Sequence, residues 1–163
     1  MRKCCLFLLA AIILAAGGAV PASPEAHPAI PEILSRAESL FQVMKTRDYP
    51  AVFAVLSTKS RETIVAQTSA SLAAAKAAVS DREAVRNDFI NGGPIAREYW
   101  DAFLRNFDPD SVLDHSLWEI GSVGKDRAEI LLTHHGAEHP AALKMFLEAG
   151  GWKVGLVETF WPR

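Results

Sequence analysis

The chain has 163 residues, of which half are hydrophobic, with 17 basic and 19 acidic side chains and a formal net charge of −2. This length suits a single domain. The near balance of charge, without any block of basic residues, argues against nucleic acid or an anionic membrane surface as a partner.

The first 22 residues have the pattern of a secretory signal peptide. Arg2 and Lys3 precede an unbroken apolar run from Cys4 to Ala16, and small residues then lead to Ala22. A positive end, a short apolar run and an Ala-x-Ala-like exit are typical of such peptides, and the run is shorter than the roughly 20 residues of a membrane span. We therefore expect cleavage after Ala22, or else after Ala26, and export to the periplasm or the extracellular space.

Cleavage would change what chemistry the chain can perform. It would remove both cysteines, Cys4 and Cys5, so the remaining 141 residues would hold no disulfide and no thiolate. Loss of Arg2 and Lys3 would leave 15 basic against 19 acidic residues, a net charge of −4. An uncleaved N-terminal anchor is the alternative. We expect residues 23–29 to be a disordered leader and residues 30–163 to form one domain.

The first half of that domain has the apolar spacing of helices. Apolar residues recur every three or four positions from Ile30 to Met44, and Pro50 disfavours helix at the residue before it. Further helices are expected at about 50–56, at 59–67 after a Ser57 cap, from a capping box at Ser80 to Phe89, and from Pro94 to Phe107. The Ala-rich stretch within residues 66–90 favours helix but offers little bulk for packing, so its structure stays open.

From about Val112 the apolar period changes to two, which predicts strands. The expected strands cover 116–123, 128–135, 143–148 and 152–161, with turns at 124–126 and at Gly150-Gly151. In the first strand Trp118 and Ile120 are expected on one face, with Leu117 and Val123 on the other. Helices followed by a four-stranded antiparallel meander predict an α+β domain in which N-terminal helices pack on a curved sheet.

Two stretches of the chain resemble the nuclear transport factor 2-like superfamily, also called the cystatin-like cone fold. Residues 37–57 contain a helix, a charged break with Asp48-Tyr49, and a second helix that ends in Leu-Ser. Residues 146–154 contain an apolar strand, a Gly turn and Trp-Lys-Val. The resemblance implies a cone-shaped sheet around a helix, a cavity at its open end and frequent homodimers. It implies no single function, because the superfamily contains dehydratases, epoxide hydrolases, isomerases and binding modules.

The faces expected to line the cone supply the candidate ligand pocket: Tyr99, Phe103, Trp118, Ile130, Leu132, His134, Leu156 and Glu158. Glu158 and His134 each interrupt an apolar face and are the candidate catalytic acid and base, with Tyr99 or Asp101 assisting. The alternative is that Glu158 and His134 lie at strand ends that are open to water.

His135 and His139 are candidate metal ligands, because imidazole binds zinc or copper and the two side chains could converge across a turn. A polar hairpin loop explains them equally well. The sequence has no nucleophile elbow and no phosphate-binding loop.

We therefore expect an exported, non-catalytic binding or accessory module without a cofactor, which takes a small apolar or amphipathic ligand. A homodimer through the sheet is a second expectation, because large apolar residues occur on both expected sheet faces; they are Trp118, Leu131, Phe146, Val157 and Trp161. The alternative function is a small acid/base enzyme of the dehydratase, isomerase or hydrolase type that uses Glu158 and His134.

Overall fold

The computed structural model describes residues 27–161, so the expected signal peptide and most of the leader lie outside the described residues. The elements are α1 (Ile30–Lys45), α2 (Tyr49–Val55), α3 (Thr58–Ala74), α4 (Arg82–Asn91), α5 (Pro94–Leu104), α6 (Pro109–His115), β1 (Ser116–Val123), β2 (Arg127–His134), β3 (Ala141–Glu148), β4 (Gly151–Gly155) and α7 (Leu156–Phe160). The strands form one antiparallel meander in the order β1-β2-β3-β4. The predicted α+β architecture, with helices before the sheet, is confirmed.

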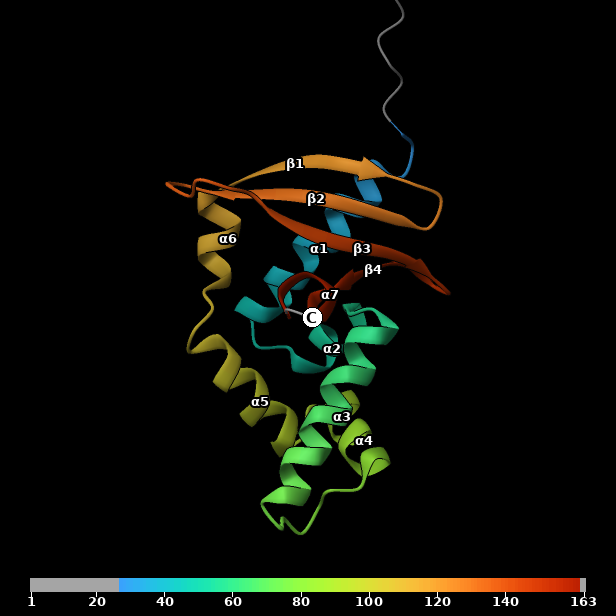
Figure 1. Cartoon of the computed structure of the whole chain (residues 1–163), viewed down its shortest axis with the longest axis vertical. Coiled ribbons are helices and arrows are strands. Elements are labelled where there is room, and N and C mark those ends of the chain that lie inside the picture. Colours follow the sequence, from blue (N-terminus) through green and yellow to red (C-terminus); the bar gives the residue numbers. More distant parts are fainter. Residues whose placement is uncertain (1–26, 162–163) are drawn as a thin grey trace, which may run out of the picture.

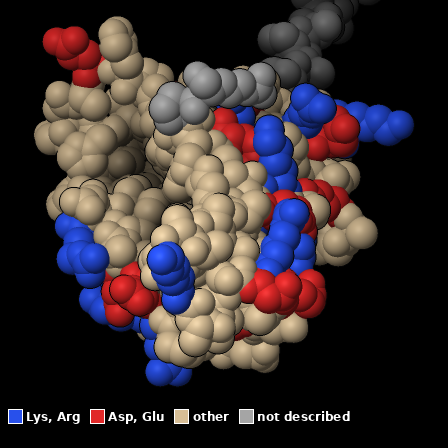
Figure 2. Space-filling model, turned by 60° about the horizontal axis from the view of Figure 1, so that its bottom comes forward, with Lys and Arg blue, Asp and Glu red and all other residues tan. Residues whose placement is uncertain are grey.

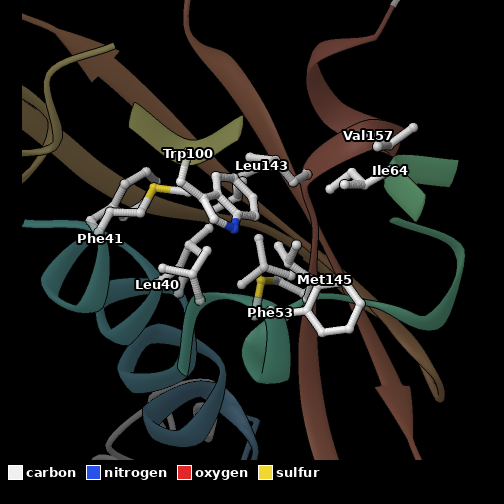
Figure 3. Close-up of a cluster of buried hydrophobic side chains, with 14 of the residues drawn as sticks. Leu40, Phe41, Phe53, Ile64, Trp100, Leu143, Met145 and Val157 are labelled. Atoms are coloured by element: carbon white, nitrogen blue, oxygen red, sulfur yellow. The ribbon is translucent and has the colours of Figure 1, made fainter. Parts of the chain in front are cut away.

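One face of the sheet packs on α1, which passes behind the strands in Figure 1, and α2–α5 continue the structure beyond the β4 edge. The buried side chains of these layers form one hydrophobic cluster. Figure 3 shows Leu40 and Phe41 of α1, Trp100 of α5, and Leu143 and Met145 of β3 converging in it. We call the opposite sheet face the outer face; the strand register places Leu117, Glu119, Glu129, Leu131, Lys144 and Phe146 on it.

Polar side chains fix the start of several helices by accepting hydrogen bonds from free backbone N–H groups. Asp48 caps α2, and Ser57 caps α3, which confirms the predicted Ser57 cap. At α4 the cap is Asp81, one residue beyond the expected Ser80, and it accepts from the amides of Glu83 and Ala84. Asp108 caps α6.

Three helical segments differ from the sequence expectation. The third helix extends to Ala74, because alanines sustain a helix even where they pack little. Helix α5 ends at Leu104 instead of Phe107. Residues 109–115 form α6, where a period of two was expected from Val112; the Asp108 cap and Pro109 in the first turn favour helix there.

The expected faces of β1 are wrong at one residue. The register between β1 and β2 shifts between Ile120 and Ser122, which is a bulge. Because the bulge adds one residue, Val123 returns to the face of Trp118 and Ile120 and packs against the core. Leu117 stays on the outer face with 61% of its surface exposed.

The second half of the expected last strand is also wrong, because β4 ends at Gly155 and the chain turns into α7. The Thr159 hydroxyl accepts a hydrogen bond from the Lys144 amide at 3.0 Å and donates one to the Gly155 carbonyl. The Lys144 amide is thereby satisfied without a longer β4. Leu156 and Glu158 consequently do not alternate on a strand face. Over residues 27–161, no helix has the length and apolar character that a bilayer span requires.

Candidate functional site

The expected pocket residues do not surround one cavity. Ile130, Leu132 and Leu156 are buried in the hydrophobic core, where close-packed side chains fill the space between sheet and helices (Figure 3). Phe103 and Trp118 are partly buried against that core. An empty cone interior is therefore absent at these described residues, and the pocket must be sought at the surface.

The side chains of Tyr99 and Asp101, both on α5, lie in different surroundings. Tyr99 lines a groove between α3 and α5 with Thr68 and Leu72, and burial raises the pKa of Tyr99 to about 12. Asp101 instead accepts hydrogen bonds from the Tyr49 hydroxyl and, at 2.8 Å, from Arg47. Asp101 thus fastens the α1–α2 link to α5.

Glu158 and His134 do not form the expected acid/base pair. Glu158 lies on α7 beside α3 and β3, whereas His134 lines a separate open depression where β2 ends. His134 is exposed, and its Nε2 lies 2.8 Å from the Ser111 hydroxyl. The pair fails because α7 replaces the strand that was expected to carry Glu158 across the sheet.

The candidate metal ligands do not line one common depression. His135 lines the same depression as His134, and His139 is exposed in the β2–β3 connection. Among residues 27–161, no group of three His, Cys, Asp or Glu side chains is placed to hold a metal ion.

A concave feature rich in charged groups lies between β3, the start of α3, and α7. We call it the charged groove. Two adjoining pockets of about 460 and 490 Å³ form it, and both are lined by Lys59, Lys144 and Glu158. Its wall also includes Arg127, Glu129, Phe146 and Glu148 at the sheet end and Trp161 at the other end.

Glu158 has a structural role in this groove. Its two carboxylate oxygens accept hydrogen bonds from the hydroxyls of Ser57 and Ser60, at 2.9 and 2.6 Å. The Ser60 hydroxyl also accepts from the Val157 amide at 3.0 Å. Both serines are buried, and a carboxylate is favoured at the N-terminus of a helix such as α3. Glu158 therefore clamps α7 onto α3.

Glu148 is held in a similar way. It accepts hydrogen bonds from the Thr58 amide at 2.9 Å and from the Thr58 hydroxyl at 2.7 Å. Two of the groove's three carboxylates are therefore already engaged with the first turn of α3, which leaves Glu129 as the third.

The cations of the groove have no such partners. Within the described part of the chain, Lys59, Arg127 and Lys144 take part in none of the side-chain ion pairs. The ring of Phe146 lines the same pocket. The lining carries three cations and three carboxylates, and donors of the first turn of α3, not these cations, hold two of the carboxylates. Cations without ion-pair partners beside an aromatic wall can bind a molecule that has both an anionic and an apolar part. Sequence reasoning missed these residues because single lysines on a helix and a strand carry no distinctive spacing.

Charges on the face that Figure 2 shows are mixed. Figure 2, with the lower side of Figure 1 brought forward, shows basic and acidic side chains next to one another around a hollowed, uncharged area. No large patch of one sign covers this face.

Comparisons with known proteins give no relative: no protein-family model, curated protein or solved structure matches the chain.

Proposed function

We propose that this chain is an exported, non-catalytic binding module of the nuclear transport factor 2-like type, and that its charged groove takes a small amphipathic anion. The observation that carries the ligand proposal is the set of three cations without ion pairs around the aromatic wall of Phe146. The resemblance in residues 37–57 and 146–154 supports the family proposal. So does the parallel bridge between Leu56 and Val154, which brings these two stretches together.

The groove favours an anionic group at its centre. Lys59 and Lys144 line both of its pockets, so both residues border the place where the pockets meet. Glu148 and Glu158 also carry negative charge, but hydroxyl and amide donors of Ser57, Thr58 and Ser60 hold both carboxylates. An anion of the ligand would contact the two ammonium groups directly.

A binding role suits the groove better than acid/base catalysis. Proton transfer needs a donor or acceptor within hydrogen-bond reach of the reacting atom. Glu158 accepts hydrogen bonds from the hydroxyls of Ser57 and Ser60, Glu148 is bonded to Thr58, and His134 lies in another depression. Export is proposed from residues 1–22 alone, which lie outside the described residues.

The test uses the fluorescent anion 1-anilinonaphthalene-8-sulfonate, which joins a sulfonate to aromatic rings. We expect it to bind the purified protein at one site per chain. The double variant Lys59→Gln/Lys144→Gln should weaken binding about tenfold, because each lost charge contact contributes about 0.7 kcal/mol. Fluorescence titration at low salt measures the dissociation constants.

The matched control is Lys76→Gln/Arg105→Gln, which removes the same charge at exposed sites that do not line the groove. This control should bind as tightly as the unmodified chain. Equal weakening in the two double variants would show that net charge alone causes the effect. That result, or no weakening in either double variant, would overturn the charged groove as the binding site.

A further inference from the structure

The root of the C-terminal helix α7 is firmly held. Glu158 accepts hydrogen bonds from the buried Ser57 and Ser60, and Thr159 bonds to the Lys144 amide and the Gly155 carbonyl. These four bonds attach residues 158 and 159 to α3 and to the sheet. Any displacement of the end of the chain would therefore begin after Thr159.

The tip beyond Thr159 is held mainly by ring contacts. The Phe160 ring lies 6.4 Å from that of Phe107, at 61°, and 39% of Phe160 is exposed. The Trp161 ring lies 6.5 Å from that of Phe103 and is parallel to it within 3°. Apart from these contacts, the Trp161 amide donates to the Val157 carbonyl at 3.0 Å. One of these ring pairs is T-shaped and the other is stacked. Aromatic pairs are weak individually, so the tip is bound less firmly than the root.

Beneath the tip, a series of aromatic rings, which we call the aromatic floor, extends inward to the core. Phe103 and Phe107 lie 5.1 Å apart, and Phe107 stacks on Phe41, which contacts Trp118 edge to face. Phe41 is fully buried, while the rings of Phe103 and Phe107 are only partly buried. The floor is thus fixed to the core and presents aromatic faces to the tip.

We propose that Phe160 and Trp161 are a displaceable plug on an aromatic binding site, and that a neutral, planar aromatic molecule enters by taking their place on Phe103 and Phe107. The indole of Trp161 shows which shape the site accepts, because a flat bicyclic ring already lies parallel to Phe103. This inference goes beyond the charged groove, since its ligand needs no anionic group. Trp161 also lines the end of that groove, so a neutral probe separates the two sites.

A plug lowers the apparent affinity by the fraction of molecules in which it is open. Removing it should therefore tighten binding without creating any new contact. Two weak ring pairs correspond to a closed state favoured by roughly tenfold or more. The intact chain should bind the ligand weakly, and a chain without the tip should bind it about tenfold more tightly.

The experiment titrates the neutral fluorophore N-phenyl-1-naphthylamine into three forms of the protein: the full chain, a form that lacks residues 160–163, and a control that lacks only residues 162–163. We expect about tenfold tighter binding at one site per chain for the longer deletion, and no change for the control. Adding Phe103→Leu to the longer deletion should abolish the gain, because it removes the stacking ring and keeps an apolar side chain.

Three results would overturn the plug: equal affinity in the two deletions, a gain that survives Phe103→Leu, or a gain without a defined stoichiometry. If the longer deletion does not fold, as judged by circular dichroism, the variant Phe160→Ala/Trp161→Ala in the full chain makes the same comparison. Failure here is distinct from failure of the charged groove, whose probe is anionic and whose variants are Lys59 and Lys144.

Discussion

At the scale of single residues, a charged residue that interrupts an apolar series can be recognised in the sequence, but its structural or catalytic role cannot. Glu158 is conspicuous because it interrupts the apolar series of Trp152, Val154 and Leu156. Its role depends on Ser57 and Ser60, which lie about 100 positions earlier in the chain and donate hydrogen bonds to it. No spacing pattern in the sequence predicts that contact. A clamp and a catalytic carboxylate would therefore be indistinguishable from the sequence alone.

Tyr99 gives a prediction about pH. Burial raises its pKa from 10.0 to about 12, because the neutral phenol is favoured in an apolar setting. Between about pH 10 and pH 12 the unfolded chain loses this proton while the folded chain retains it. The free energy of unfolding should then fall with rising pH, by at most about 1.4 kcal/mol per pH unit.

The variant Tyr99→Phe lacks this proton and should be less sensitive to alkali. The Tyr99 hydroxyl has no hydrogen bond to residues 27–161, so the variant should match the unmodified chain near pH 8. Urea unfolding at pH 8 and pH 11 measures both. Identical alkaline losses in the two proteins would contradict the assigned burial.

At the scale of elements, the sequence predicts long periodic segments well and short switches poorly. The first helix and the strand at 116–123 lie where the periodicity places them. The change from β4 to α7 was missed because Trp152, Val154 and Leu156 fit a strand, and a five-residue helix is too short to establish its own period. The seven residues of α6 were missed for the same reason. Since α7 carries Glu158 and Trp161, the site could not be predicted without that switch.

Gly155 marks the switch and gives a prediction about stability. A Cβ atom at Gly155 would overlap the ring of Phe146, which leaves a side chain no space there. Gly155→Ala should therefore lower the free energy of unfolding by about 1–3 kcal/mol, the usual effect of overpacking. The control Gly124→Ala meets its nearest atom at an ordinary 3.4 Å and should change stability by less than about 1 kcal/mol. Urea unfolding compares the two, and equal effects would show that the ring of Phe146 does not restrict position 155.

At the scale of the whole molecule, the β1–β2 part of the outer face is the surface that we propose a second copy covers. Leu117 is 61% exposed there, and Leu131 lies on the same face, as expected of an apolar patch between two copies. Lys144 and Phe146 of β3 line the charged groove, so the proposed interface leaves them accessible to a ligand.

A dimer through this face predicts a selective effect of substitution. The unmodified chain should sediment as a dimer, and Leu117→Lys should shift it to monomer because a buried, unpaired ammonium group is unfavourable at an interface. Leu147→Lys, at a position 45% exposed on the other side of β3, should leave the dimer intact. A monomer for the unmodified chain at every concentration would contradict the proposed pairing.

The central claim is that the space between β3, α3 and α7 binds an amphipathic anion. The most direct measurement is a ¹H–¹⁵N NMR titration of the intact protein with 1-anilinonaphthalene-8-sulfonate. We predict saturable shifts at the amides of Lys59, Thr63, Phe146, Glu148 and Glu158, which line the charged groove. Saturable shifts confined to His134, His135 and the neighbouring residues, or to Tyr99 and Leu72, would place the ligand elsewhere and contradict the account.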